Sequence, residues 1–198
     1  MSDPYAPLGA EAPMFQESPA SGLLISRPTV RFMFSHPAHL FALGWGSGLT
    51  RLAPGTVGTL WSWVAFVVAS RWLNDAGWGL VIALSLPLGW WACSVTARHM
   101  DRPDPGQIVW DEVAAFWLVL WLVMPTGFWG QLVAFALFRY FDAVKPGPVG
   151  WADRLFHGIR PETHANAWTL AGLGIMLDDL VAAGCTLFTI AVWRFLWA

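Results

Sequence analysis

Charged residues are scarce in this chain, since Asp, Glu, Lys and Arg together make up 12% of its 198 residues. The eleven Lys and Arg are scattered between apolar runs and the formal net charge is −2, so no basic stripe could track a nucleic-acid backbone. Cysteine is rarer still: Cys93 and Cys185 lie far apart, without His or Cys neighbours at metal-ligand spacing. These absences argue against a nucleic-acid partner, a disulfide framework and a zinc site.

Hydrophobic residues, in contrast, reach 56% of the chain and include fifteen Trp, more than a soluble domain of this size normally carries. This composition predicts a membrane protein. The first thirty residues hold five Pro and three acidic residues, without the basic start and long apolar core of a signal peptide. We therefore expect residues 1–34 to form a disordered arm and residues 35–198 to form one domain.

Apolar runs fall at 56–70, 78–97, 113–124, 128–138 and 180–197. The second and the last are long enough to span a bilayer, whereas the third and fourth are short and are joined by the turn Pro125-Thr126-Gly127. That pair forms a helical hairpin, which either re-enters the membrane or packs as a core pair. The predicted fold is all-α, a compact membrane-associated helical bundle with a polar site on its cytoplasmic side.

The positive charges predict an orientation, because cytoplasmic loops near span ends accumulate Lys and Arg. With a cytoplasmic amino terminus and the short pair treated as one re-entering unit, only Arg71 and Arg194 lie outside. The cytoplasmic set is then Arg27, Arg31, Arg51, Arg98, Arg102, Arg139, Lys145, Arg154 and Arg160. The same orientation places every acidic residue except Asp75 on the cytoplasmic side.

Five charged residues are concentrated in residues 139–154, directly after an apolar run. Arg139 and Asp142 are three apart and can share one helix face, and Pro146 ends the helix just after Lys145. Asp153 and Arg154 complete the group. The segment is either a solvated helix end with weak surface ion pairs or a rigid corner that binds phosphate.

A glycine-rich segment, residues 44–59, precedes the first apolar helix and is a second candidate for anion binding. Backbone N–H groups around Gly46, Ser47 and Gly48, with Thr56 at the helix start, could hold a phosphate. The Gly-Lys-Ser/Thr ending of a nucleotide-binding loop is missing. The alternative is a flexible entry loop in which Thr56 is the N-cap of the helix.

Two acidic pairs, Asp111-Glu112 and Asp178-Asp179, open the third and the last apolar runs. Helix capping favours acids at such positions, but a carboxylate near hydrocarbon costs several kcal/mol unless it is paired or metal-bound. Carboxylate oxygens are the ligands that Mg²⁺ prefers. The two pairs therefore predict a Mg²⁺ site, and His157 is a further candidate for proton transfer.

The motifs, taken in order, resemble the phosphatidylglycerophosphatase A family. They are Ala53-Pro54-Gly55-Thr56-Val57-Gly58, Trp110-Asp111-Glu112, Phe138-Arg139, Phe141-Asp142, Lys145-Pro146, Asp153-Arg154, His157-Gly158 and Gly172-Leu173-Gly174-Ile175-Met176-Leu177-Asp178-Asp179. The resemblance covers about residues 36–197. It implies an all-helical, Mg²⁺-dependent hydrolase of the bacterial inner membrane that converts phosphatidylglycerophosphate into phosphatidylglycerol and phosphate.

The expected site combines the residues from both lines of argument. Catalytic roles are expected for Asp111, Glu112, Asp142, Asp153, Asp178 and Asp179, with Asp111, Glu112, Asp178 and Asp179 as metal ligands. Substrate binding is expected from Gly46, Ser47, Gly48, Thr56, Arg139, Lys145 and Arg154, and the partner is a phospholipid in the membrane.

Two features depart from the family pattern. Residues 159–171 are inserted between His157-Gly158 and Gly172, and we expect them to form a surface excursion. Lys145-Pro146-Gly147-Pro148 lacks the usual Trp after its first Pro. The alternative function is a non-catalytic membrane module or transporter subunit, but the chain shows no inverted repeat that would favour it.

Overall fold

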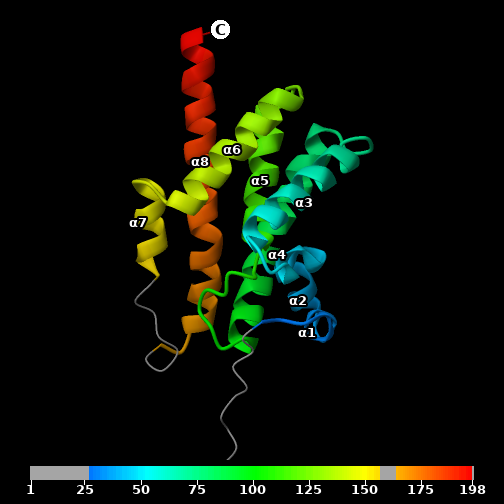
Figure 1. The fold of residues 1–198 in the computed structure, drawn as a ribbon, viewed down its shortest axis with the longest axis vertical. Coiled ribbons are helices and arrows are strands. Elements are labelled where there is room, and N and C mark those ends of the chain that lie inside the picture. Colours follow the sequence, from blue (N-terminus) through cyan, green and yellow to red (C-terminus); the bar gives the residue numbers. More distant parts are fainter. Residues whose placement is uncertain (1–26, 157–163, 198) are drawn as a thin grey trace, which may run out of the picture.

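The computed structural model describes residues 27–156 and 164–197, and these residues contain helices and no strand, as the predicted all-α class requires (Figure 1). The helices are α1 Val30–Phe34, α2 Pro37–Ala42, the 3₁₀ helix η1 Gly44–Leu49, α3 Pro54–Ala69, α4 Asp75–His99, α5 Trp110–Val123, α6 Phe128–Val144, α7 Pro148–Leu155 and α8 Ala167–Trp197. Residues 1–26 of the expected arm lie outside the described residues. Because α1 ends before residue 35, helical structure begins within that arm. The division into an arm of residues 1–34 and a domain of residues 35–198 stays a prediction.

Local sequence signals set most helix ends. The Asn74 side chain accepts a hydrogen bond from the Gly77 N–H at 2.8 Å and caps α4, and Pro54 occupies the first turn of α3, where no partner for its nitrogen is needed. As predicted, α6 ends before Pro146, with Lys145 in the left-handed conformation at φ 49°. α7 then begins at Pro148, so the charged corner joins two helices.

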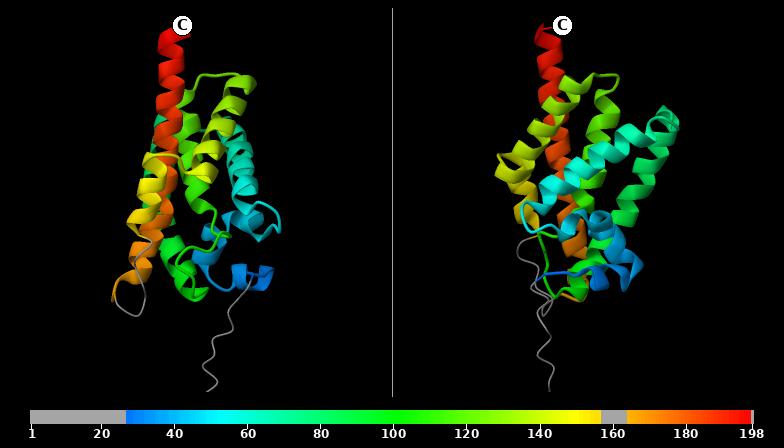
Figure 2. Two further views of the ribbon diagram at one scale, coloured as in Figure 1. Left: turned by 60° about the vertical axis from the view of Figure 1, so that its left-hand side comes forward. Right: turned by 45° about the vertical axis from the view of Figure 1, so that its right-hand side comes forward.

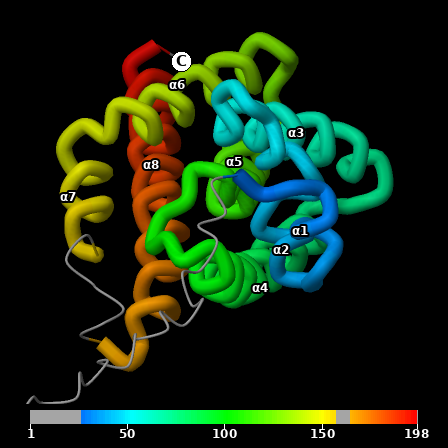
Figure 3. Tube along the Cα trace, turned by 60° about the horizontal axis from the view of Figure 1, so that its bottom comes forward, coloured from blue at the N-terminus to red at the C-terminus, as the bar shows by residue number. Residues whose placement is uncertain are grey.

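Helix α5 lies at the centre of the bundle, with α3, α4, α6 and α8 around it (Figure 3). Ten of its fourteen residues are buried, including Phe116 and Leu120 with no exposed surface. Only α6 of the predicted hairpin is largely exposed on one side. Because α5 is surrounded by protein, its apolar run needs no lipid to cover it, whereas only Ala134 and Phe138 of α6 are buried.

Two helices are long and apolar enough to cross a membrane, α4 with 25 residues and α8 with 31. At about 1.5 Å per residue they reach roughly 37 and 46 Å, which exceeds the about 30 Å thickness of a hydrocarbon core. α8 also exposes large apolar side chains near its end, such as Phe195 at 89% and Phe188 at 70%. These properties fit the predicted membrane association.

Helix α4 approaches both α5 and α8 closely because a glycine lies at each of these two crossings. A Cβ at Gly89 of α4 would stand 2.5 Å from Trp110 Cδ1 of α5, and a Cβ at Gly172 of α8 would stand 2.7 Å from the backbone nitrogen of Ser94. Side chains at either position would push the helices apart. The start of α5 and the middle of α8 are thereby brought to within a side chain's reach of each other.

The start of α8 corrects two expectations. Asp178 and Asp179 do not open the last helix, since α8 begins at Ala167, more than two turns earlier. Residues 167–171, expected in a surface excursion, form its first turns, where Ala167 and Ala171 are buried and the Thr169 carbonyl accepts a hydrogen bond from Trp90 Nε1. Residues 157–163 of the excursion lie outside the described residues.

The two ends of the molecule differ in what they contain. The α3–α4 connection and the carboxyl end of α8 lie at one end, whereas α1, α2 and the end of α4 lie at the other (Figure 2). The loop after α4 runs back into the bundle before α5 begins. The charged start of α5 and the charged end of α6 therefore lie on the side of the molecule away from the α5–α6 turn.

Candidate metal and phosphate site

Three carboxylates converge where the start of α5 meets the middle of α8. Asp111, Glu112 and Asp179 each offer an oxygen, and these oxygens lie within 4.8 Å of one another. Asp179 is 2% exposed and Glu112 is 8% exposed, and the Asp111 Oδ1 atom is also buried. Three like charges in so small a volume repel each other strongly unless a cation or protons compensate them.

The cluster has the free oxygens that a cation needs. Asp111 Oδ1, Glu112 Oε2 and Asp179 Oδ2 are buried and accept no hydrogen bond. Buried polar atoms are nearly always paired, so three orphaned oxygens in one cluster require an explanation. Burial, more than any neighbouring group, raises the pKa of Glu112 to about 7, and burial together with the nearby carboxylates raises the pKa of Asp111. A hard divalent cation fits this donor set.

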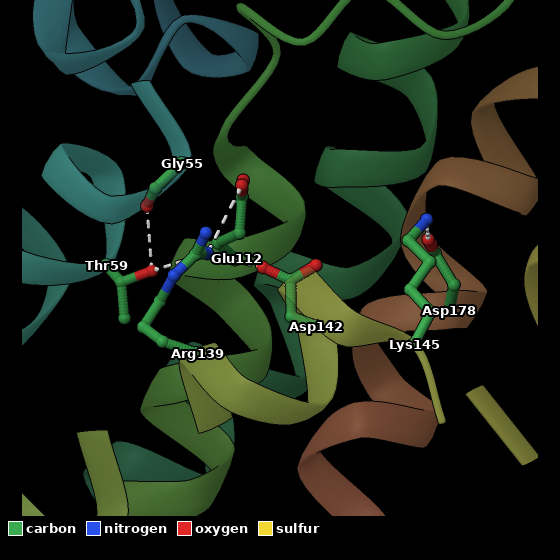
Figure 4. Close-up of polar contacts among 7 residues, drawn as sticks. All are labelled: Gly55, Thr59, Glu112, Arg139, Asp142, Lys145 and Asp178. Carbon is green, nitrogen blue, oxygen red and sulfur yellow. Dashed lines mark hydrogen bonds and ion pairs between the residues drawn. The ribbon is translucent and has the colours of Figure 1, made fainter. Parts of the chain in front are cut away.

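Arg139 of α6 lies beside the cluster and is the cation that the structure supplies (Figure 4). Its Nη1 donates to Asp142 one helical turn later, lies 3.7 Å from Glu112 Oε1 and donates to Thr59 Oγ1 at 3.4 Å. The predicted pairing of Arg139 with Asp142 on one helix face is therefore confirmed. The Arg139 Nε atom is buried and has no acceptor.

The first turn of α3 lies against the same group. A Cβ at Gly55 would overlap Glu112 Oε1 and would lie 3.3 Å from both terminal nitrogens of Arg139. The Gly55 carbonyl also accepts the Thr59 hydroxyl at 2.8 Å, which turns the Thr59 oxygen toward Arg139. Position 55 therefore accepts only glycine, because no side chain fits between α3 and the cluster.

Lys145 forms a second charged contact on the other side of the cluster. Its Nζ donates to Asp153 of α7. It also donates to Asp178 of α8 (Figure 4). Burial alone would lower the Lys145 pKa, but the two carboxylates outweigh burial and raise the pKa above its ordinary value. Asp178 thus pairs with a lysine. Of the four predicted metal ligands, the other three, Asp111, Glu112 and Asp179, lie in one group.

Other predicted site residues lie in η1, in the first turn of α3 and on α7. Gly46, Ser47 and Gly48 belong to η1, where the Ser47 hydroxyl is buried and donates to the Gly44 carbonyl at 2.8 Å. Thr56 is not the N-cap of α3, because that helix begins at Pro54 with Ala53 before it. Arg154 is exposed on α7, and His157 lies outside the described residues.

Sequence reasoning did not single out Thr59 or the steric role of Gly55. Thr59 is fully buried and is the last residue of the glycine-rich segment 44–59, three residues beyond Thr56. The helical periodicity was the available signal, because Thr59, four residues after Gly55, lies on the same face of the helix as Gly55.

Fold and site together define an all-helical, largely apolar protein whose bundle encloses a carboxylate cluster beside an arginine, and this cluster could hold a metal ion. The sequence profile of the family described as phosphatidylglycerophosphatase A matches residues 40–194. The chain belongs to this family.

Two curated relatives support the same assignment. Phosphatidylglycerophosphatase A of Escherichia coli strain K12 is 39% identical over 153 residues, which are 77% of this chain and 80% of the relative. Phosphatidylglycerophosphatase A of Haemophilus influenzae is 35% identical over 158 residues, 80% of this chain and 89% of the relative. No solved structure matches the chain significantly. The expected family and enzyme class, a phosphoric monoester hydrolase, are thereby confirmed over the non-catalytic alternative.

Proposed function

We propose that the chain hydrolyses phosphatidylglycerophosphate to phosphatidylglycerol and phosphate at a Mg²⁺ site formed by Asp111, Glu112 and Asp179. One observation carries this proposal. Three buried carboxylate oxygens without donors and one buried Arg139 Nε–H without an acceptor belong to a single cluster. A cation together with a phosphate group satisfies both kinds of unpaired atom at once.

The side chains have distinct roles in this proposal. Asp111, Glu112 and Asp179 hold the ion, which when bound would polarise the phosphoryl oxygen and activate a water. Arg139 binds a phosphoryl oxygen through Nε and is held by Asp142, Glu112 and Thr59. The arginine charge then opposes the negative charge that develops as the phosphate ester breaks.

Lys145, Asp153 and Asp178 form the frame of the site. The ammonium of Lys145 ties α7 to α8 one residue before Asp179, which fixes the turn of α8 that carries the ligand. Asp178 therefore acts as a positioning residue in this proposal, and so does Asp153. The exposed Arg154 and the η1 residues Gly46, Ser47 and Gly48, together with Thr56, are proposed only for outer contacts with the substrate head group.

The proposed setting is the bacterial inner membrane, with the site facing the cytoplasm. The uneven distribution of Lys and Arg supports it, because nine of eleven belong to one side of the expected topology. Arg71 follows α3 and Arg194 is near the end of α8, and both helices end on the side of the molecule away from α1 and α2 (Figure 1).

Phosphate release by the purified full-length protein tests this function. The substrates are phosphatidylglycerophosphate, phosphatidic acid and phosphatidylinositol 3-phosphate in mixed micelles, each assayed with Mg²⁺ and with a chelator. We expect Mg²⁺-dependent release that is fastest from phosphatidylglycerophosphate. Equal release with chelator present would exclude the metal site, and preferential cleavage of another lipid would exclude the proposed substrate.

A further inference from the structure

A small cationic pocket opens where the glycine-rich segment runs into α3. It is lined by residues 27–28 and 48–51, by Pro54 and by Gln107, and its cavity volume is about 60 Å³. Pockets that hold whole ligands typically measure about 300–1,000 Å³. This pocket therefore has room for one compact group, such as a single phosphate, and not for a lipid chain.

The charges in the lining favour an anion. Arg27 and Arg51 line the pocket, and no acidic residue is among its lining residues. Within residues 27–156 and 164–197 the ion pairs are made by Arg139 and Lys145, so neither pocket arginine has a carboxylate partner there. Guanidinium groups bind phosphate oxygens through charge-assisted hydrogen bonds. A phosphate group is thus the ligand that this lining fits.

The pocket adjoins the metal and phosphate site. Pro54 lines the pocket, and a Cβ added to the next residue, Gly55, would overlap Glu112 Oε1 and lie 3.3 Å from both terminal nitrogens of Arg139. Gln107 lines the pocket three residues before α5 begins. Because consecutive Cα atoms are about 3.8 Å apart, a single step along α3 separates the pocket wall from the contacts of the site.

The surroundings of the pocket favour a lipid phosphate over a free ion. Leu52 follows Arg51 in the loop that leads into α3, and its side chain is 84% exposed. An exposed leucine beside an arginine suits the membrane interface, where the apolar side chain meets lipid and the basic one meets lipid phosphates. Arg27 and Arg51 also belong to the side of the expected topology on which the site is proposed to face.

We infer that this cationic pocket holds the phosphodiester of the phospholipid substrate while Arg139 binds the phosphate that is removed. The inference rests on the proposed function, because it assigns a further part of the same substrate. In phosphatidylglycerophosphate one glycerol joins the two phosphate groups, whereas phosphatidic acid has a single phosphate. Arg27 and Arg51 bind the diester oxygens. Gln107 Oε1, which is buried and accepts no hydrogen bond within the protein, accepts the free hydroxyl of that glycerol.

A substrate without the diester charge tests the role of Arg51. Phosphate release is measured with dihexanoyl phosphatidylglycerophosphate and with its methylphosphonate analogue, whose diester position is neutral. We expect the analogue to raise the KM of the wild-type protein about tenfold, and Arg51→Gln to show the same high KM for both substrates. Arg51 is exposed, so its substitution leaves the core intact. The matched control is Arg31→Gln, an exposed arginine outside the pocket lining, which should behave as wild type.

Binding without turnover provides a second test. Dihexanoyl phosphatidylglycerol keeps the diester but lacks the phosphate that is removed, and its affinity is measured by calorimetry with a chelator present. We expect Arg51→Gln to weaken this binding about tenfold and Arg31→Gln to leave it unchanged.

Three results would overturn the inference: Arg51→Gln still discriminates tenfold between the two substrates, both arginine variants weaken phosphatidylglycerol binding equally, or Arg51→Gln weakens the binding of inorganic phosphate alone. The last result would show a free-phosphate site. A wild-type protein that binds phosphatidylglycerol through Arg51 but releases no phosphate would refute the proposed function instead.

Discussion

Gly55 of α3 and Glu112 of α5 are in direct contact, although 57 positions separate them, and an added Cβ on Gly55 would overlap Glu112 Oε1. The same Cβ would crowd both terminal nitrogens of Arg139 at 3.3 Å. One missing side chain thus allows the first turn of α3 to cover the acidic cluster and its arginine.

Gly55→Ala should therefore inactivate the protein without unfolding it. The added methyl group displaces Glu112 or Arg139, and a shift of about 1 Å at a reacting centre costs about a hundredfold in rate. Phosphate release per folded molecule measures the effect. Gly184→Ala in α8 is the control, because nothing lies within 4 Å of its added Cβ, and it should retain full activity. Normal activity in Gly55→Ala would show that the contact has no role.

Thr59→Val should weaken substrate binding through Arg139. The valine keeps the volume of this fully buried residue but removes the oxygen that accepts from Arg139 Nη1. A lost hydrogen bond to a charged group is worth roughly 1.5–3 kcal/mol when buried, so KM should rise by about tenfold while kcat changes less. Thr59→Ser restores the hydroxyl and should restore KM. A Ser variant as defective as the Val variant would point to packing instead.

Lys145→Met should destabilise the fold. It removes the ammonium that pairs with Asp153 and Asp178, two partly buried carboxylates. The loss should be about 1–2 kcal/mol, less than for a fully buried pair because the Lys145 side chain is 30% exposed. Thermal unfolding in detergent at neutral pH measures it.

The difference in stability between the wild-type protein and Lys145→Met should depend on pH in a defined direction. The folded-state pKa of Lys145 is raised, so its stabilisation is fully present below the unfolded pKa of about 10.4 and is lost as pH rises through the folded value. The gap in Tm between wild type and Lys145→Met should therefore be constant from pH 7 to 9 on this account. A gap that vanishes near neutral pH would contradict the pairing.

Much of the fold was predictable because apolar runs and helix-ending residues carry strong local signals. The hairpin between α5 and α6 and the end of α6 at Lys145 follow from Pro125 and Pro146. The start of α8 was not predictable in the same way. Residues 167–171 carry a weak helix signal by themselves, and packing of Gly172 against Ser94 of α4 supports the start of α8 at Ala167, ahead of Asp178.

The sequence pointed to the charged residues of the candidate site, but it could not show which of them lie together. Adjacent acids such as Asp178 and Asp179 look equivalent in sequence. On α8, however, successive residues point about 100° apart, so Asp179 faces Glu112 whereas Asp178 faces Lys145. Thr59 likewise becomes significant only when Arg139 is brought against α3 from eighty residues away.

The most direct test of the metal site compares the two adjacent acids of α8. Mg²⁺-dependent phosphate release from phosphatidylglycerophosphate is measured per folded molecule for Asp179→Asn, Asp111→Asn and Asp178→Asn. The account predicts that Asp179→Asn and Asp111→Asn each lose about a thousandfold in rate, about 4 kcal/mol of barrier, while Asp178→Asn keeps Mg²⁺-dependent turnover within about tenfold of wild type. Near-normal, Mg²⁺-dependent release by Asp179→Asn and Asp111→Asn would contradict the assignment of the cluster as the metal site.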